Sequence, residues 1–419
     1  MTRRRDFLKQ SLGAGAGITS AWGMMALAQR HAAANRHEGL RPNFVWITSE
    51  DNSASWLPSY GHPLSKTPAL DGLVAEGFRY TNCFANAPVC APQRSTWLTG
   101  MYSLSLGTHH MRSRNRIPLD KVPLYPLLLK QAGYFCTNSG KTDYNASGLP
   151  DDLWDIASKG EHSLWRKRPE GKPFFAVVNN GMTHEGSTLK HQEIETDPAK
   201  VEIRPYHPDT PVTRHYYAQY IDSQYRMDKR IGEVVAQLKE DALLEDTIIV
   251  YCSDHGGALP RGKRDIRDTG LHCPLVVRIP EKFKHLWPNA ERGTTVDRLV
   301  SFIDMPKTWL AIAGAEIPEA MQGRVFLGPK SEPEPEYHHA FVSRYDARLD
   351  NSRAVRDKRF LDIRHYMPYT IYGQYIEYRA RGRFYQQWLR LFREGKLDAV
   401  QAGYFQPKPV EELYDTQAD

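Results

Sequence analysis

The sequence predicts an α/β fold, in which a mostly parallel β-sheet is sandwiched by helices and is followed by a smaller C-terminal α+β subdomain. Continuous apolar runs alternate with helical patterns along the chain, which is typical of parallel strands buried on both faces. After the Pro- and Glu-rich stretch 328–336 the pattern changes, and residues 352–356 and 359–365 predict a pair of strands joined by a short turn.

The individual elements follow from their periodicity. At 67–77, Leu70, Leu73 and Val74 recur at helical spacing, and Gly77 is a helix-ending residue. Apolar, β-branched and aromatic runs of strand length predict buried strands. The elements expected in order are a strand at 43–48, a helix at 67–77, strands near 135–139 and at 172–179, a long helix at 213–238, and strands at 247–252 and 274–279.

Length and composition describe a globular protein. The chain has 419 residues, of which 41% are hydrophobic and 25% are charged. This composition excludes a disordered chain and a collagen-like repeat, and five cysteines are too few for a disulfide scaffold. We expect a main α/β domain over 41–330 and a smaller subdomain over 331–419, with no membrane span in either.

The first 34 residues predict an export signal and linker. Arg4 and Arg5 precede Phe7-Leu8-Lys9, a weakly apolar Gly/Ala-rich run follows, and small residues end it near Ala28. The paired arginines resemble the twin-arginine type of signal, and the alternative, an amphipathic surface helix, is disfavoured by the glycines. A periplasmic or secreted location is therefore expected. Half of the net charge of +6 lies in residues 1–28, so the net positive charge of the chain gives no support for a nucleic-acid partner.

Polar residues follow four of the expected strands. Taken singly, each has a structural explanation, because acidic residues often cap helices and a lone histidine is commonly hydrogen-bonded. Ligand sites in open α/β sheets form beyond the carboxyl ends of the strands, so four coincident cases predict one composite site. The residues concerned are Glu50 and Asp51, Lys141 and Asp143, His184, and Asp254 and His255.

Three carboxylates and a histidine at one site predict a bound cation. Bare carboxylates repel one another strongly in a low-dielectric pocket. Glu50, Asp51 and Asp254 offer oxygen ligands, which hard divalent ions prefer. The pattern therefore favours Ca²⁺, with Mg²⁺ or another divalent ion as the alternative.

A second motif surrounds Cys90. Pro92 could start a helix, and the free N–H groups of a helix N-terminus favour an anion. Arg94 would lie near Cys90 if the turn is helical. From the residues alone, Cys90 is either a buried inert thiol or a thiolate nucleophile activated by the helix and Arg94.

Cys90, Pro92 and Arg94, followed by Leu98-Thr99-Gly100, resemble the signature of the type I sulfatases. The resemblance extends over residues 41–415 and implies the alkaline-phosphatase-like fold. It also implies that a maturase converts Cys90 to formylglycine, the catalytic aldehyde. Within the family, the sequences of residues 108–112 and 140–145 are similar to those of bacterial glycan sulfatases related to heparan N-sulfatase.

The resemblance also implies a role for each matching residue. Arg94, Lys141 and Lys263 would hold the aldehyde and the sulfate group, while His184 would protonate the departing atom. A hydroxyl of the hydrated aldehyde would attack sulfur, and the second hydroxyl would then expel sulfate. The implied metal-ligand positions are Glu50, Asp51, Cys90, Asp254 and His255.

The sequence departs from the family pattern at several positions. Glu50 replaces the more usual Asp, and His255 stands where Asn is the common alternative, which leaves the metal open. Asp143 occupies a position that is commonly His, so it either replaces that histidine or binds a sugar hydroxyl. The chain ends at Asp419, inside a segment that the family usually continues, which predicts a truncated subdomain.

Substrate recognition is expected near four residues, His109, His110, Arg112 and Asp143, for which a polar surface loop is the alternative. The aromatic and basic run 366–393 predicts either sugar contacts or an amphipathic helix packed on the domain.

The predicted function is hydrolysis of a sulfate ester or N-sulfate on a sulfated carbohydrate. Its partners would be the sulfated saccharide and the maturase. The alternatives are a phosphomonoester or phosphodiester hydrolase of the same superfamily, and a non-catalytic module that binds sulfated glycans.

Overall fold

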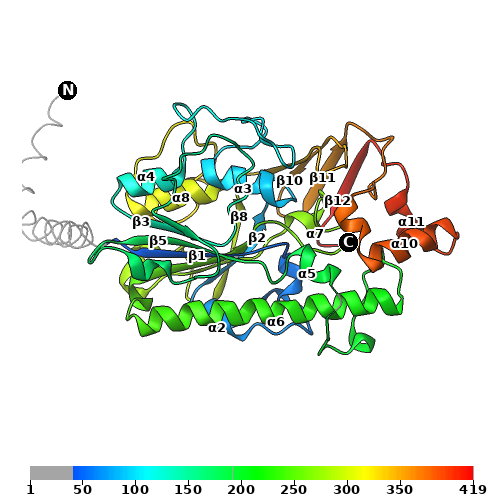
Figure 1. Ribbon diagram of the computed structural model, residues 1–419, viewed down its shortest axis with the longest axis horizontal. Helices are drawn as coiled ribbons and strands as arrows, with labels where there is room; N and C mark the ends of the chain where they lie inside the picture. The colour runs from blue at the N-terminus through cyan, green and yellow to red at the C-terminus, as the bar shows by residue number, and fades with distance from the viewer. Residues whose placement is uncertain (1–40, 191, 419) are drawn as a thin grey trace, which may run out of the picture. The chain divides into compact units, whose positions relative to one another are not determined.

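The central element is an eight-stranded sheet, seen in the computed structural model, which describes residues 41–190 and 192–418 (Figure 1). The strand order is β4-β3-β5-β1-β6-β7-β2-β8, and β7 alone among these strands runs antiparallel to its neighbours. The predicted mostly parallel sheet is confirmed. The strands are β1 (Asn43–Ser49), β2 (Phe78–Phe84), β3 (Phe135–Ser139), β4 (Ile156–Ser158), β5 (Phe174–Asn180), β6 (Thr247–Ser253), β7 (Leu275–Arg278) and β8 (Thr294–Ser301).

Helices cover both faces of this sheet, which explains its unbroken apolar strands. In β1, Phe44 and Trp46 join the core beneath one set of helices, while Val45 and Ile47 join the core on the opposite face. Figure 1 shows α4 and α8 on one side of the sheet and α2 and α6 on the other. The helices around the sheet are α2 (Pro68–Ala75), α3 (Cys90–Thr99), α4 (Tyr125–Gln131), α5 (Glu185–Leu189), α6 (Pro211–Glu240), α7 (Asp268–Leu271) and α8 (Asp304–Ala313).

The aromatic and basic run 366–393 divides between core and surface. It contains the short helix α9 (Glu377–Ala380) and the helix α10 (Arg383–Arg393), and α11 (Ala399–Ala402) follows. Trp388 of α10 is buried and packs in one cluster with Tyr217 of α6, as an amphipathic helix packed on the domain would. Tyr369 and Tyr375 are instead 72% and 63% exposed.

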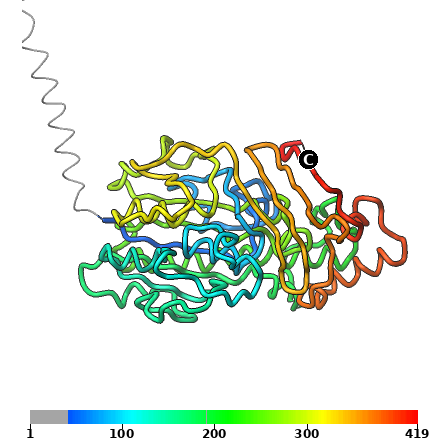
Figure 2. The backbone as a smooth tube through the Cα atoms, turned by 90° about the horizontal axis from the view of Figure 1, so that it is seen from above, coloured from blue at the N-terminus to red at the C-terminus, as the bar shows by residue number. Residues whose placement is uncertain are grey.

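A second, four-stranded antiparallel sheet has the order β12-β11-β10-β9. Its strands are β9 (His338–Val342), β10 (Ser352–Arg356), β11 (Phe360–His365) and β12 (Glu411–Asp415), so the predicted strand pair is present as β10 and β11. Figure 2 shows this sheet, in orange and red, at one end of the main sheet. Val89 and Ala91, on either side of Cys90, pack in one cluster with Ala354 of β10, so the Cys90 segment packs against the second sheet.

From Asn43 onward the chain forms one compact unit that includes both sheets. The expected export signal and linker at 1–34 lie outside the described residues. Within the described part, none of the helices is long and apolar enough to cross a bilayer.

We expect Asp350→Ala to lower the free energy of unfolding by about 3–5 kcal/mol, because it leaves two buried cations without their carboxylate. Lys408 Nζ and Arg348 Nη2 each lie 2.6 Å from an Asp350 carboxylate oxygen, and all three side chains are buried. Urea unfolding measures the effect. Asp362→Ala, an exposed position on β11, is the matched control, and an equal loss in both variants would contradict the prediction.

Candidate active site

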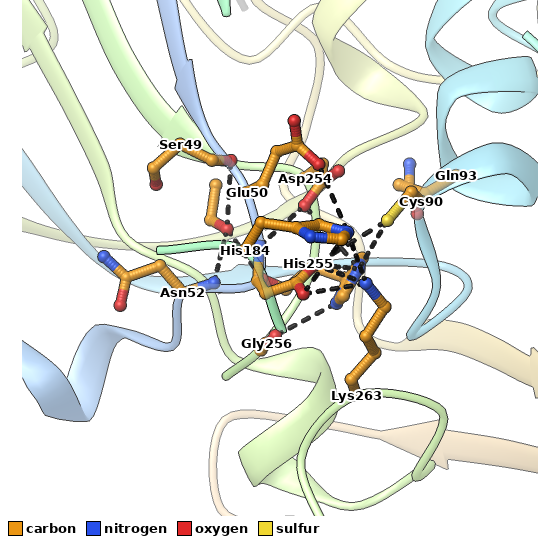
Figure 3. A network of polar contacts seen from close by, with 12 residues as sticks. Ser49, Glu50, Asn52, Cys90, Gln93, His184, Asp254, His255, Gly256 and Lys263 are labelled. Carbon is orange, nitrogen blue, oxygen red and sulfur yellow. Dashed lines mark hydrogen bonds and ion pairs between the residues drawn. The ribbon is translucent and has the colours of Figure 1, made fainter. Parts of the chain in front are cut away.

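The polar residues that follow the strands meet at one edge of the main sheet. β1 lies between β5 and β6 in parallel register, with Ser49 opposite both Asn180 and Ser253, so these strands end at the same level. Glu50, Asp51, Lys141, His184, Asp254 and His255 all follow such strand ends, and Figure 3 shows Glu50, His184, Asp254 and His255 gathered with Cys90 and Lys263.

Asp51 is the centre of the cluster. Its backbone is left-handed, with φ of 53°, and its N–H donates to Asp254 Oδ1 at 3.0 Å. Its carboxylate accepts from Lys263 Nζ at 2.7 Å and from Glu185 N at 2.7 Å, and it lies 3.0 Å from His255 Nε2. Burial raises the pKa of Asp51, but Lys263 and the two histidines outweigh burial and hold that pKa well below its usual value. Asp51 is therefore a buried carboxylate anion.

The helix α3 begins at Cys90, two residues before Pro92, where the sequence predicted the helix start. Gln93 fixes the preceding loop, because its Oε1 accepts from the N–H groups of Asn86 and Ala87 at 2.7 and 3.1 Å. Cys90 Sγ lies 3.2 Å from His255 Nε2 and 3.6 Å from Asp51 Oδ1. The sulfur therefore faces the charged cluster.

The thiol of Cys90 differs electrostatically from the other four cysteines. Burial raises the pKa of Cys90, but Lys141 and Lys263 outweigh burial and lower that pKa to about 6. At Cys83, Cys136, Cys252 and Cys273 burial raises the pKa above the ordinary value. The surroundings of the unmodified Cys90 thus favour the thiolate, which is one of the two alternatives that the sequence left open.

Each carboxylate of the cluster has a basic partner within the chain. Lys141 Nζ is 2.6 Å from Glu50, Lys263 Nζ is 2.7 Å from Asp51, and Arg94 Nε is 3.2 Å from Asp254. The expectation that only a metal could relieve the repulsion is therefore incomplete, because lysine and arginine already offset these charges. The case for a metal depends instead on the donor atoms.

Four donor atoms are arranged as a divalent ion would require. Ligand atoms of Asp51, Cys90, Asp254 and His255 all lie within 4.8 Å of one another, and all four residues are buried. His255 Nδ1 lies 3.0 Å from the Gly256 carbonyl oxygen and donates to it, so Nε2 is the nitrogen that faces Asp51 and Cys90. Burial lowers the pKa of His255, but Asp254, Cys90 and Asp51 outweigh burial and raise that pKa to about 10, so Nε2 would give up its proton when it binds an ion. Two carboxylates and one imidazole fit a divalent ion.

Glu50 differs from the other predicted metal ligands. It belongs to a second group of possible ligand atoms with Asp51, Cys90 and His184, and it is not grouped with Asp254 and His255. Its carboxylate is engaged by Lys141.

His184 lies between the cluster and solvent, with 29% of its side chain exposed. Gly186 N donates to His184 Nδ1 at 3.0 Å, so the ring proton of the neutral imidazole is on Nε2. Nε2 lies 3.2 Å from Lys263 Nζ. Burial and Lys263 lower the pKa of His184, but Asp51 and Cys90 outweigh them and raise it. Two donors thus face each other beside Cys90.

The predicted substrate-binding residues divide into two groups. Arg112 Nη1 is 2.5 Å from Asp143, whose other oxygen is 3.6 Å from Lys141 Nζ, so these residues continue the charged cluster outward. The rings of His109 and His110 are 4.2 Å apart, and His110 Nδ1 accepts from Arg344 N at 3.3 Å. These two histidines therefore contact each other and the loop of Arg344 rather than the cluster.

Sequence reasoning missed four residues that support the cluster. Arg94 Nη1 donates to Asn179 Oδ1 at 2.6 Å, and Arg264 Nη1 donates to Glu185 at 2.8 Å. Asn179 lies near the end of β5 and Glu185 follows His184, so the same strand-end signal could have found both. Tyr220 donates from its hydroxyl to the Asp51 carbonyl, but its place in the apolar pattern of α6 indicated only a core residue.

Fold and site together define an α/β protein in which a buried cysteine and a group of possible metal ligands meet at the carboxyl edge of the parallel strands. The family model described as Sulfatase matches residues 42–148 and 155–315, and the chain belongs to this family. The C-terminal domain model of N-sulphoglucosamine sulphohydrolase matches residues 261–378. The predicted family and its alkaline-phosphatase-like fold are confirmed, and the protein is a sulfuric ester hydrolase.

Relatives and solved structures agree with this assignment. An ulvan-active sulfatase of Formosa agariphila is 37% identical over 90% of this chain and 70% of its own length. Human N-sulphoglucosamine sulphohydrolase is 26% identical over 79% and 75%. A protein solved in complex with its substrate D-glucosamine-2-N,6-O-disulfate has a TM-score of 0.62 at 19% identity, covering 90% of this chain and 92% of that chain, which shows the shared fold.

Proposed function

We propose that this protein removes sulfate from a sulfated saccharide at Cys90, after a maturase has converted Cys90 to formylglycine. The observation that carries the proposal is the position of Cys90, at the start of α3 and 3.2 Å from His255, among three carboxylates and three basic side chains. Relatives named for action on ulvan and on N-sulphoglucosamine support a sulfated glycan as the substrate class. The bond cleaved is an O-sulfate or an N-sulfate.

The basic side chains bind the sulfate group in this proposal. Lys141 and Lys263 belong to different loops, and both work against burial to lower the pKa of Cys90. Arg94 keeps its hydrogen bonds to Asp254 and Asn179 and thereby fixes the positions of these two side chains. Cations aimed at the sulfuryl oxygens stabilise the charge that spreads over them in the transition state.

His184 holds the proton for the leaving group. Its Nδ1 is occupied by Gly186 N, so the proton at Nε2 points toward Lys263. Lys263 Nζ and His184 Nε2 are 3.2 Å apart, and a substrate oxygen that contacts both nitrogens would accept from each of them. Gly186 N orients the ring, and the Asp51 carboxylate, 3.9 Å from Nε2, works against burial and Lys263 to raise the pKa of His184.

Asp51, Asp254 and His255 would hold the divalent ion, next to Cys90. A bound divalent ion supplies Lewis-acid activation of an oxygen nucleophile and stabilises developing negative charge. Asp51 also binds Lys263, so an ion held by Asp51 would leave Lys263 free for the sulfate group, whereas Arg94 keeps its bond to Asn179. We favour Ca²⁺ because carboxylates dominate the donor set.

The test is a desulfation assay with purified protein co-expressed with a maturase. Free sulfate is measured with N-, 2-O-, 4-O- and 6-O-sulfated saccharides, and aryl sulfate and aryl phosphate esters are compared in parallel. Mass spectrometry reports the state of Cys90. Sulfate release from a saccharide, with Cys90 modified, is expected. Preferential phosphate release would favour the phosphoester hydrolase, and glycan binding without turnover would favour the binding module.

Lys141→Ala is expected to lower kcat/KM for sulfate release by about 10²–10³-fold, because it removes one positive group that faces the sulfuryl oxygens. Lys284→Ala is the matched control, since Lys284 lies outside the cluster and pairs with Glu281 with 66% of its side chain exposed. An exposed ion pair is worth about 0–1 kcal/mol, so we expect less than about a fivefold change. Equal losses in the two variants would refute the role of Lys141.

Export is part of the proposal. The signal-like residues 1–28 support a periplasmic or secreted enzyme. Replacing Arg4 and Arg5 together by lysine is expected to retain the protein in the cytoplasmic fraction, while the parent is recovered outside it. Cell fractionation followed by immunoblotting measures this. Unchanged export of the double variant would exclude the twin-arginine route.

A further inference from the structure

A cavity of about 380 Å³ lies between the loop before α7 and the strands β11 and β12, and none of the cluster residues around Cys90 lines it. Small-molecule sites commonly measure about 300–1,000 Å³. Figure 1 places α7 beside β12. The residues that matter for its chemistry are Arg204, Tyr206, Arg261, Arg267, Leu361 and Tyr414.

The lining carries uncompensated positive charge. Arg267 is already paired, at 3.0 Å, with both Asp265 and Glu412, and Asp268 is paired with Arg356. The contacts found for Arg204 and Arg261 among the described residues are with neutral side chains, namely Trp56, Ser55 and Tyr206, and Arg261 acts on the buried Asp265 carboxylate at longer range. Two guanidinium groups in one cavity therefore remain available for an anion.

Both of these arginines are held in place by aromatic rings. The Arg204 guanidinium lies 4.9 Å from the Trp56 ring centroid and donates to Tyr206 Oη at 3.0 Å and to Ser55 Oγ at 2.8 Å. The Arg261 guanidinium lies 4.0 Å from the Tyr206 ring centroid. Side chains ordered in advance lose little entropy when a ligand binds.

One loop serves both this cavity and the active site. Lys263 contacts Asp51 and Arg264 contacts Glu185, whereas Arg261 and Arg267 line the cavity. The loop is braced by a hydrogen bond from Lys263 N to the Gly257 carbonyl at 2.7 Å. A ligand in the cavity would thus be bound to the loop that supplies Lys263.

We propose that this cavity is a second saccharide-binding site, in which Arg204 and Arg261 bind a sulfate group and Tyr414 and Leu361 contact the sugar. It rests on the proposed function, since its ligand is another unit of the same sulfated polymer. A second contact raises the local concentration of the remaining chain at the active site without any change in the chemical step.

The test measures binding stoichiometry in the full chain by calorimetry, with Cys90→Ala as background so that nothing is turned over. A sulfated disaccharide, its desulfated counterpart and inorganic sulfate are the three ligands. Two sulfated disaccharides per chain are expected, falling to one in Arg204→Ala/Arg261→Ala and also to one in Lys141→Ala. Arg390→Ala, an exposed arginine on α10, is the matched control. Arg261→Lys keeps the positive charge and should still bind two disaccharides, so it separates the loss of charge from misfolding.

The kinetic arm uses protein with intact Cys90. Arg204→Ala/Arg261→Ala is expected to raise KM for the sulfated polymer about tenfold while kcat/KM for a small aryl sulfate is unchanged. One site in the background protein, or two sites that survive the double substitution, would overturn the proposal. Equal affinity for inorganic sulfate would exclude the sugar contact. Loss of sulfatase activity with two-site binding intact would instead refute the proposed function alone.

Discussion

Cys90→Ala abolishes turnover in our expectation, with kcat for sulfate release falling by about 10⁵–10⁶-fold, the scale seen when an enzyme loses its nucleophile. The alanine side chain can form no aldehyde, and Cys90 Sγ is the group of the cluster that faces both Asp51 and His255. Initial rates of sulfate release from the preferred saccharide measure the effect.

Two further variants make this result specific. Cys136→Ala, a buried cysteine of β3 whose sulfur contacts the Pro126 carbonyl, should keep its activity at some cost in stability. Cys90→Ser retains one hydroxyl but has no second hydroxyl to expel sulfate. It should therefore release at most one desulfated saccharide per chain, with the sulfate retained as an ester on the oxygen of the substituted side chain. Continued turnover by Cys90→Ala would exclude this residue as the nucleophile.

The sequence predicted the buried strands better than the strands at the sheet margin. β1 and β6 are buried throughout, because helices cover both of their faces. β8 was missed because its first five residues are exposed or half-buried and include Asp297 and Arg298. Strand β2 was missed because polar residues, including Arg79 and Asn82, interrupt its apolar pattern.

The sequence predicted which residues gather around Cys90, but it did not predict which of them form ion pairs with one another. Strand ends pointed to Glu50, Asp51 and Asp254 without any knowledge of tertiary contacts. Lys263 follows no strand directly and came only from the family resemblance. Nothing in the sequence indicates that Lys141 pairs with Glu50, 91 residues away, or that Arg264 pairs with Glu185. Those contacts depend on how loops fold over the strand ends.

Replacing Asp51 is expected to have the second largest effect. Asp51→Asn keeps the size of the side chain, and Asn tolerates the left-handed backbone that this position requires. It removes the charge that holds Lys263 and one ligand of the proposed divalent ion. We expect kcat to fall by about 10³-fold or more, on the scale of a lost electrostatic stabiliser, and metal content measured by elemental analysis to fall with it.

Asp51→Ala separates the loss of charge from backbone strain. A non-glycine residue other than Asn or Asp pays about 1–2 kcal/mol in this conformation, so Asp51→Ala should unfold more easily than Asp51→Asn by that amount. Breaking the buried pair with Lys263 costs both variants about 3–5 kcal/mol. Asp362→Asn, exposed on β11, is the control for amide substitution. If Asp51→Asn kept both metal and activity, the ion would have to be bound elsewhere and Asp51 would serve only to pair with Lys263.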